Sequence, residues 1–179
     1  MKKIYTPLSQ SSIKSLKAGD EVLLSGVIYT ARDLAHQQML NKIVKGKRPP
    51  IPLKGQVIYY CGPTTAPKKR VIGSCGPTTS SRMDAFTPAL LRAGLLGMIG
   101  KGSRDSSVKE AIRRHRAVYF LAIGGAGALL ASKVKECRVV AYKEFGPEAI
   151  YELKVDDFPL IVGIDSRGGD IFRLCQKGG

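Results

Sequence analysis

The sequence has few residues of the kinds that hold metal ions, and they are not spaced as metal ligands usually are. It contains four cysteines and two histidines in 179 residues. Cys61, Cys75, Cys137 and Cys175 form no Cys-x-x-Cys pair, so neither a zinc site nor an iron–sulfur cluster site is indicated. We therefore expect reduced thiols and no metal bound by this chain.

Long apolar runs are also missing. No stretch approaches the roughly 18 apolar residues that a membrane-spanning helix needs. The basic start at Met1, Lys2 and Lys3 is not followed by the apolar core of a signal peptide. Apolar residues make up 44% and charged residues 24% of the chain, which is typical of a globular domain. We expect a cytoplasmic protein, without a membrane partner, in which residues 1–179 form a single domain.

Acidic residues are scarce relative to basic ones. Fourteen Asp and Glu stand against 29 Lys and Arg, which gives a net charge of +15. Such an excess suits nucleic acid, an acidic protein partner or small anionic substrates. Nucleic acid is disfavoured, because aromatic residues are not interleaved with the basic runs and no RNP, KH or zinc-finger pattern occurs. A basic RNA- or protein-binding module without enzymatic activity remains an alternative.

Strand-like and helix-like segments alternate irregularly, which predicts an α/β fold with a mixed β-sheet and flanking helices. Thr30 is the expected cap of a helix that starts near Arg32, and Ser106 or Ser107 that of a later one. Strands are expected at 21–30, 57–60, 71–73, 96–99, 117–123, 138–142, 150–155 and 160–165. Helices are expected near 13–17, from 32, at 83–94, at 106–114 and in a short segment that ends at 133.

The pentapeptide Cys-Gly-Pro-Thr-Thr occurs twice, at 61–65 and at 75–79. Each copy ends an apolar, strand-like run. Glycine lets the backbone approach a ligand, proline stiffens the loop, and the hydroxyls and N–H groups can hold an anion. Two such loops side by side can form the floor of one pocket.

The two copies differ in the residues that come after them. Only the second continues into Ser80-Ser-Arg-Met-Asp84 and a helical pattern. A hydroxyl-rich turn at a helix start gathers N–H donors, and Arg82 adds a guanidinium that can grip a carboxylate through two hydrogen bonds. The second copy is therefore the expected place for chemistry, and the first is expected to form a pocket wall.

Three further residues are candidates for the same pocket. Arg32 lies at a helix start, where a cation opposes the helix dipole; a salt bridge with Asp33 is the structural alternative. His36 lies one helical turn later and is either structural or functional. Lys101 lies between two glycines after a short strand. Arg32, Thr78, Arg82 and Lys101 together predict a cationic, hydroxyl-lined pocket for a small dicarboxylate.

A glycine-rich run, Gly124-Gly-Ala-Gly127, follows a strand and precedes a helix. It fails the dinucleotide fingerprint G-x-G-x-x-G, because Leu130 occupies the third glycine position. We interpret the run as a tight turn between a strand and a helix.

Several short motifs occur along the chain in one order. They are Thr30–His36, Gly62–Thr65, Ser74–Asp84, Gly100–Gly102, Gly124–Gly127, Gly146–Ile150 and Asp157–Pro159. In this order they resemble the β-subunit, or C-terminal domain, of iron–sulfur-dependent (class I) fumarate hydratase and L-tartrate dehydratase. The resemblance runs from about Tyr5 to Phe172, and Gly-Pro-Thr-Thr-x-x-Arg-Met-Asp is its most specific segment.

The resemblance implies a swivelling β/β/α domain that works against an α-subunit. In that family the α-subunit holds a [4Fe-4S] cluster, whose open iron site binds the substrate and the departing hydroxyl. A chain of this kind would bind no cluster itself and would be inactive without the α-subunit. The expected assembly is a homo-oligomer of the β-chain or of an αβ unit.

Carried over position by position, the resemblance assigns Thr78 as the base that removes a proton next to a carboxylate. A threonine hydroxyl is a weak base at neutral pH, so nearby cations would have to stabilise its alkoxide. The expected reaction is the reversible hydration of fumarate to L-malate, with an L(+)-tartrate dehydratase β-subunit as the alternative. The substrate-binding group would comprise Arg32, Arg82, Lys101, Gly76 and Thr79, with His36 in a supporting role.

Overall fold

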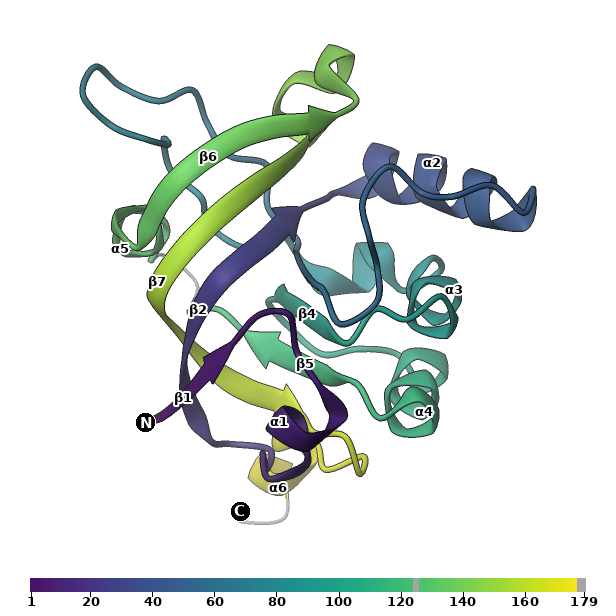
Figure 1. The fold of residues 1–179 in the computed structure, drawn as a ribbon. Coiled ribbons are helices and arrows are strands. Elements are labelled where there is room, and N and C mark those ends of the chain that lie inside the picture. The colour runs from purple at the N-terminus through teal and green to yellow at the C-terminus, as the bar shows by residue number, and fades with distance from the viewer. Residues whose placement is uncertain (124–125, 177–179) are drawn as a thin grey trace.

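The computed structural model describes residues 1–123 and 126–176, so Gly124 and Gly125 of the glycine-rich run lie outside the described residues. Its sheet has seven strands in the order β1-β2-β3-β4-β5-β7-β6, and an additional β2–β7 pairing closes five of them into a barrel (Figure 1). β2, β3, β4 and β5 are parallel to one another, whereas β7 is antiparallel to both β5 and β2. The barrel strands are β2 (Glu21–Thr30), β3 (Val57–Tyr59), β4 (Gly97–Gly100), β5 (Val118–Leu121) and β7 (Ile150–Ile164).

Two further strands extend this barrel. β1 (Lys2–Tyr5) pairs in parallel with β2, and β6 (Val134–Ala141) pairs antiparallel with β7. β1 was missed from sequence, because its four residues do not stand out from the polar N-terminal segment.

The helices lie around this sheet. α2 (Asp33–Val44), α3 (Thr87–Arg92) and α4 (Ser106–His115) line one side of the barrel, while α1 (Gln10–Lys14) and α6 (Ile171–Gln176) lie at its lower end (Figure 1). α5 (Gly127–Ser132) and the short 3₁₀ helices η1 (Ser80–Met83) and η2 (Lys143–Glu148) complete the fold. The predicted α/β class with a mixed sheet and flanking helices is confirmed; the swivelling β/β/α character stays a prediction.

Strand alternation explains how the core divides. Val57 and Tyr59 of β3 join one buried cluster that draws on all five barrel strands, in which Tyr59 meets Phe158 edge to face. Ile58 and Tyr60, which point the other way, join a second cluster with apolar residues of α2, α3 and α4. The barrel strands are therefore buried on both faces, as parallel strands usually are.

The prediction of a strand at 71–73 is wrong. The chain from Cys61 to Thr79 is a long hairpin-like loop instead (Figure 1). Its two arms touch where Thr64 N–H donates to the Ser74 carbonyl at 3.0 Å and Gly73 N–H donates to the Thr64 carbonyl at 3.2 Å. The two pentapeptide copies thus lie side by side, as expected, but only the first follows a strand.

The strands predicted at 150–155 and 160–165 are one strand. The intervening Asp157 has a φ of +47°, and its N–H donates to the Ser25 hydroxyl at 2.9 Å, next to a register shift between Leu24 and Gly26. β7 therefore continues through a bulge-like irregularity at a segment that the sequence pattern predicted to separate two strands.

Helix starts or caps differ from the predictions in four places. α1 was predicted near 13–17 but begins at Gln10, where the Ser9 side chain caps it. Thr30 does not cap α2, because its hydroxyl accepts a hydrogen bond from the Tyr151 N–H at 3.1 Å. α4 is capped by Asp105, whose carboxylate accepts from the Val108 N–H at 2.8 Å, rather than by a serine. α3 begins later than predicted, with Pro88 in its first turn. In the part of the chain that the structure describes, no helix is both long and apolar enough to cross a bilayer.

Candidate active site at the carboxyl ends of the parallel strands

The carboxyl ends of parallel strands meet at one edge of the barrel, where open α/β sheets commonly bind ligands. β2 delivers Arg32 to this edge, and β4 delivers Lys101. The second pentapeptide copy reaches the same edge because Thr78 N–H donates to the Tyr60 carbonyl, just beyond β3, at 2.6 Å. Thr79 forms a parallel bridge with Lys101, so three distant segments converge.

Arg82 and Asp33 join η1 to α2. The guanidinium Nε and Nη2 of Arg82 donate to the two carboxylate oxygens of Asp33 at 3.0 and 2.9 Å. The expected alternative for Arg32, a salt bridge with Asp33, is present only at 4.0 Å from Nε to Oδ2. Asp33 therefore holds Arg82 far more closely than it holds Arg32.

Arg32 lies against the first pentapeptide copy. A Cβ atom at Gly62 would be 2.9 Å from both Cδ and Nη1 of Arg32, so this side chain occupies space that only glycine leaves free. Arg32 Nε is buried without a hydrogen-bond partner among the described residues and is 3.8 Å from Glu148 Oε1. Glu148 Oε1 likewise has no hydrogen-bond partner among those residues, so these two buried groups compensate each other's charge only through their ion pair.

His36 is fully buried behind this edge. Its Nδ1 is 2.8 Å from the Arg32 carbonyl oxygen, which can only accept, so the Nδ1–H tautomer is assigned. Burial, with a contribution from the Arg104 charge, lowers the His36 pKa to about 4, although the bond to the Arg32 carbonyl opposes this shift. His36 is thus a neutral ring that packs against Tyr60 and Phe86 and fixes the backbone of Arg32.

A buried ion pair that sequence reasoning missed connects η1 to the loop after β4. Arg104 Nε donates to Asp84 Oδ1 at 2.6 Å, and Asp84 Oδ2 accepts from the Asp105 N–H at 2.9 Å. The Arg104 guanidinium also lies over the rings of Tyr60 and Tyr119, at 5.3 and 5.0 Å from their centroids. Asp84 belongs to the Arg-Met-Asp motif, but no pattern in the sequence identifies Arg104 as its partner.

The predicted base and one predicted cation remain available for a ligand. Thr78 is half-buried and Lys101 is exposed, and within the described residues neither side chain donates or accepts a hydrogen bond. The other two predicted contacts, Gly76 and Thr79, flank Thr78 in the same loop. The structure therefore brings all seven predicted residues to one edge or directly behind it, with Arg82 half-exposed.

The cysteines of the two pentapeptide copies do not provide a metal site. Cys61 and Cys75 are buried free thiols, and the hydrogen bond with Cys75 together with burial raises the pKa of Cys61. Among residues 1–123 and 126–176, no three cysteine, histidine or acidic side chains form a possible metal site. What this edge offers chemically is a set of cations, two of which are paired with the carboxylates of Asp33 and Glu148, together with threonine hydroxyls and backbone N–H groups.

Comparison with known proteins identifies the family of this chain. The family model for the fumarase C-terminus matches residues 2–175. The aerobic class I fumarate hydratase of Escherichia coli K12 is 36% identical over 178 residues, which are 98% of this chain and 32% of that protein. A putative L(+)-tartrate dehydratase subunit beta of Methanocaldococcus jannaschii is 36% identical over 183 residues, covering 99% of this chain and 94% of that protein.

Fumarate hydratase 2 of Leishmania major is 34% identical over 172 residues, 95% of this chain and 29% of that protein. The chain thus spans about a third of the length of these two fumarate hydratases and nearly all of the tartrate dehydratase subunit. The family resemblance noted from the motifs is confirmed. We conclude that this chain belongs to the fumarase C-terminus family, whose relatives are hydro-lyases.

Proposed function

We propose that this chain is the β-component of an iron–sulfur-dependent hydro-lyase that interconverts fumarate and L-malate. One observation supports this more than any other: Arg32, Arg82 and Lys101 converge with Thr78 at the carboxyl edge of the barrel. A dicarboxylate carries two anionic groups, and separated cations can hold both at once. The similarity to fumarate hydratases supports the same reaction class.

In the dehydration direction, a proton leaves the carbon next to one substrate carboxylate. Thr78 would accept that proton as an alkoxide, and the hydroxyl on the neighbouring carbon would depart. Negative charge spreads into the carboxylate as the C–H bond breaks, so the cations that bind this group stabilise the transition state more than the ground state. The same positive charges would stabilise the Thr78 alkoxide and so lower the pKa of the Thr78 hydroxyl.

The [4Fe-4S] cluster of the proposed enzyme would be held by an α-subunit; the name of the M. jannaschii relative, a subunit beta, supports a partner of this kind. Among the described residues of this chain, no three cysteine, histidine or acidic side chains form a possible metal site. The α-subunit would also cover the open edge of the site. Lys101 is exposed and the Arg82 side chain is 51% exposed, so water screens both charges in the isolated chain. Exclusion of water by the partner would strengthen them, which is why we expect no activity from this chain alone.

An L(+)-tartrate dehydratase β-subunit is the second candidate. The M. jannaschii relative is named as a separate beta subunit, and the match covers 94% of its length. The same cations would bind the two carboxylates of tartrate, so the described geometry does not favour one substrate over the other.

The test is anaerobic reconstitution of the full chain with a candidate α-subunit, iron and sulfide. Fumarate hydration, malate dehydration and tartrate dehydration are assayed in parallel, with each subunit omitted in turn as controls. Turnover that needs both subunits supports the proposal, and the preferred substrate selects between the two candidates. A complex that has an intact cluster by spectroscopy and turns over none of the three substrates contradicts it.

A further inference from the structure

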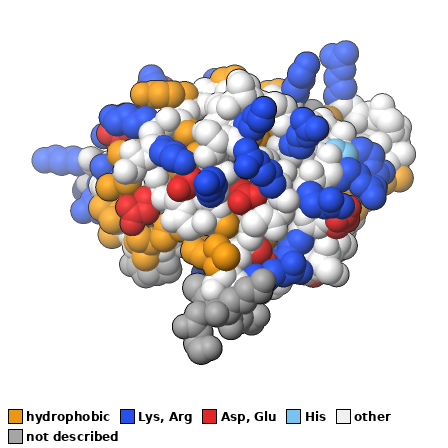
Figure 2. All heavy atoms as spheres, turned by 90° about the horizontal axis from the view of Figure 1, so that it is seen from below, with side chains coloured by type: hydrophobic (Ala, Val, Ile, Leu, Met, Phe, Trp, Pro, Cys, Tyr) orange, Lys and Arg blue, Asp and Glu red, His pale blue; other side chains and the backbone are white. Residues whose placement is uncertain are grey.

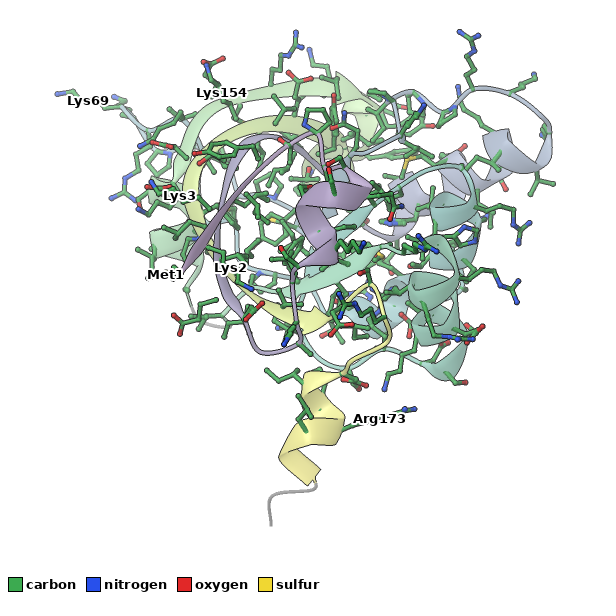
Figure 3. All side chains as sticks on the ribbon, turned by 60° about the horizontal axis from the view of Figure 1, so that its bottom comes forward. Met1, Lys2, Lys3, Lys69, Lys154 and Arg173 are labelled. Atoms are coloured by element: carbon green, nitrogen blue, oxygen red, sulfur yellow. The ribbon has the colours of Figure 1, made fainter. Side chains whose placement is uncertain are left out.

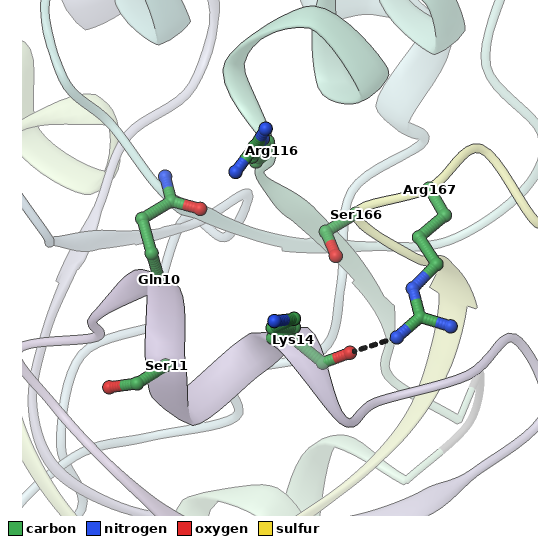
Figure 4. Close-up of a pocket in the computed structure, with 6 residues that line it drawn as sticks. All are labelled: Gln10, Ser11, Lys14, Arg116, Ser166 and Arg167. Atoms are coloured by element: carbon green, nitrogen blue, oxygen red, sulfur yellow. Dashed lines mark hydrogen bonds between the residues drawn. The ribbon is translucent and has the colours of Figure 1, made fainter.

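A hollow lined by three cationic side chains lies at the opposite end of the barrel from the candidate active site. It is bounded by α1, by the end of α4 and by the loop after β7, and has a volume of about 440 Å³ (Figure 4). Arg116 in this hollow precedes the amino end of β5, whereas the candidate active site lies at the carboxyl ends of the strands. The lining residues are Gln10, Ser11, Lys14, Arg116, Ser166 and Arg167.

The charges around the hollow are all positive. Lys14, Arg116 and Arg167 come from three separate elements, and the remaining lining side chains are two hydroxyls and one amide. Within the described residues, none of these three cations is within salt-bridge distance of a carboxylate. Figure 2, which views the molecule from the end that carries α1 and α6, shows Lys and Arg side chains spread over this face.

The lining is held in place by hydrogen bonds. Arg167 Nη2 donates to the Lys14 carbonyl at 3.2 Å (Figure 4), and Gln10 Nε2 donates to the His115 carbonyl at 3.3 Å. The Arg167 N–H donates to Asp165 Oδ1 at 2.9 Å, which fixes the loop after β7. These contacts join α1 to the other two elements, so the hollow is part of the packed fold.

Arg116 adopts a backbone conformation that is unfavourable for residues other than glycine. It ends α4 in the left-handed region, with φ of 51° and ψ of 44°, where glycine is the usual residue. An arginine at this position brings a guanidinium to the rim of the hollow at a conformational cost that glycine would avoid.

We propose that this hollow binds a small phosphate-bearing anion. Two guanidiniums, an ammonium and two hydroxyls supply donors for several phosphate oxygens, and guanidinium geometry suits paired phosphate oxygens. A single orthophosphate would fill only part of the volume, so a diphosphate group is the better match. The ligand would be recognised by charge and by hydrogen bonds, independently of the reaction at the other end of the barrel.

Thermal unfolding of the full chain with pyrophosphate tests this site. Pyrophosphate should raise Tm in a saturable way, beyond the effect of NaCl at matched ionic strength. Arg116→Gly should raise the Kd for pyrophosphate by about tenfold or more, through loss of a charge-assisted contact. This variant should fold well, because glycine suits the left-handed position.

Lys69→Gly is the matched control. Lys69 is also an exposed cation with a positive φ, 68°, but it projects from the tip of the 61–79 loop (Figure 3). The Lys69→Gly substitution should leave the Kd for pyrophosphate unchanged. The proposal is overturned if both variants weaken binding equally, if NaCl reproduces the effect, or if fumarate binds there and pyrophosphate does not.

A second inference concerns Asp33 and rests on the proposed function. Asp33 occupies the Nε and Nη2 side of the Arg82 guanidinium, at 3.0 and 2.9 Å. A guanidinium has another edge, formed by Nη1 and Nη2, which can bind a second carboxylate. Within the described residues, Arg82 Nη1 makes no hydrogen bond, so this edge is available.

We infer that Asp33 is a positioning residue that fixes Arg82 for the substrate carboxylate. The Asp33 side chain is 31% exposed and comes from α2, so it couples Arg82 to a helix that also carries His36. Without Asp33, the exposed Arg82 side chain would sample many orientations. The conformational entropy lost when the substrate orders this side chain would then weaken substrate binding.

The experiment measures the Kd of succinate, an unreactive dicarboxylate, for the reconstituted complex. Asp33→Asn should raise Kd by about tenfold, whereas the same substitution in an Arg82→Met background should have no further effect. Glu110→Gln is the control, because it breaks a similar two-point contact with Arg113 on α4, at 3.2 and 3.0 Å.

An unchanged Kd for Asp33→Asn overturns the inference, as does an equal rise in both Arg82 backgrounds. A wild-type complex that binds succinate but catalyses no hydration refutes the proposed function alone.

Discussion

The two copies of the pentapeptide place a glycine at the same position in different surroundings. A Cβ at Gly62 would lie 2.9 Å from Cδ and Nη1 of Arg32 and 3.1 Å from the Pro147 carbonyl oxygen. Among the described residues, a Cβ at Gly76 would meet only the Cα of Gly127, at 3.8 Å. We therefore predict that alanine destabilises the protein at Gly62 and not at Gly76.

The magnitudes follow from these distances. Carbon atoms in good contact are about 3.5–4.0 Å apart, so the Arg32 side chain must retreat by about 0.6 Å or more to accept a methyl group. Overpacking of this kind costs about 1–3 kcal/mol, and replacing glycine returns about 0.4–1 kcal/mol by restricting the unfolded chain. Gly62→Ala should lower the free energy of unfolding by about 1 kcal/mol, and Gly76→Ala should raise it by about 0.5 kcal/mol.

Urea unfolding of the full chain, followed by circular dichroism, measures both changes as shifts in midpoint at constant m-value. In an Arg32→Ala background the closest clash is removed, so the cost of Gly62→Ala should shrink by about 1 kcal/mol. Equal costs with and without the Arg32 side chain would refute the reasoning. Equal effects of the two alanine substitutions would refute it as well.

Three other predictions use the same chain. In the reconstituted complex, Thr78→Ala should lower kcat by about 10²-fold or more; a near-normal kcat removes Thr78 as the base. Because the His36 pKa falls from 6.5 to about 4 on folding, the unfolded state binds more protons below pH 6.5, so this residue's stabilising contribution is lost as pH falls. Between pH 7 and pH 5 the loss should be about 2 kcal/mol in urea unfolding; it should disappear in His36→Gln and persist in His115→Gln. Arg104→Met leaves the Asp84 carboxylate buried and unpaired, so it should lower the free energy of unfolding by about 3–5 kcal/mol; a loss below about 1 kcal/mol would contradict the buried pair.

The strands were predictable where local pattern and burial agree. The apolar runs that became β3, β4 and β5 are short and almost fully buried, and β2 combines alternation with β-branched residues. Val71–Gly73 has a similar composition but joins no strand ladder; the Gly73 N–H and the Ser74 carbonyl pair with Thr64 across the loop instead. Whether such a run pairs is decided by tertiary structure, which composition does not encode.

The candidate site was predictable in part for a similar reason. Thr78, Arg82 and Lys101 follow strand-like runs or turn motifs, so their convergence at one edge could be inferred from topology. Their partners could not be inferred in the same way. Asp33 meets Arg82 across 49 residues and Asp84 meets Arg104 across 20, and no local spacing rule relates such pairs.

The double role of β7 has a consequence for folding. This strand pairs with β5 on one side and with β2 on the other, so the barrel cannot close until Ile150–Ile164 has been synthesised. Until then, a nascent chain would present β2 and β5 as two open edges, and unpaired edges promote association between chains. Because β2 lies near the start of the chain, closure depends on contacts of very long sequence separation, which slows folding. Truncation before β7 should therefore produce aggregation rather than a smaller folded domain.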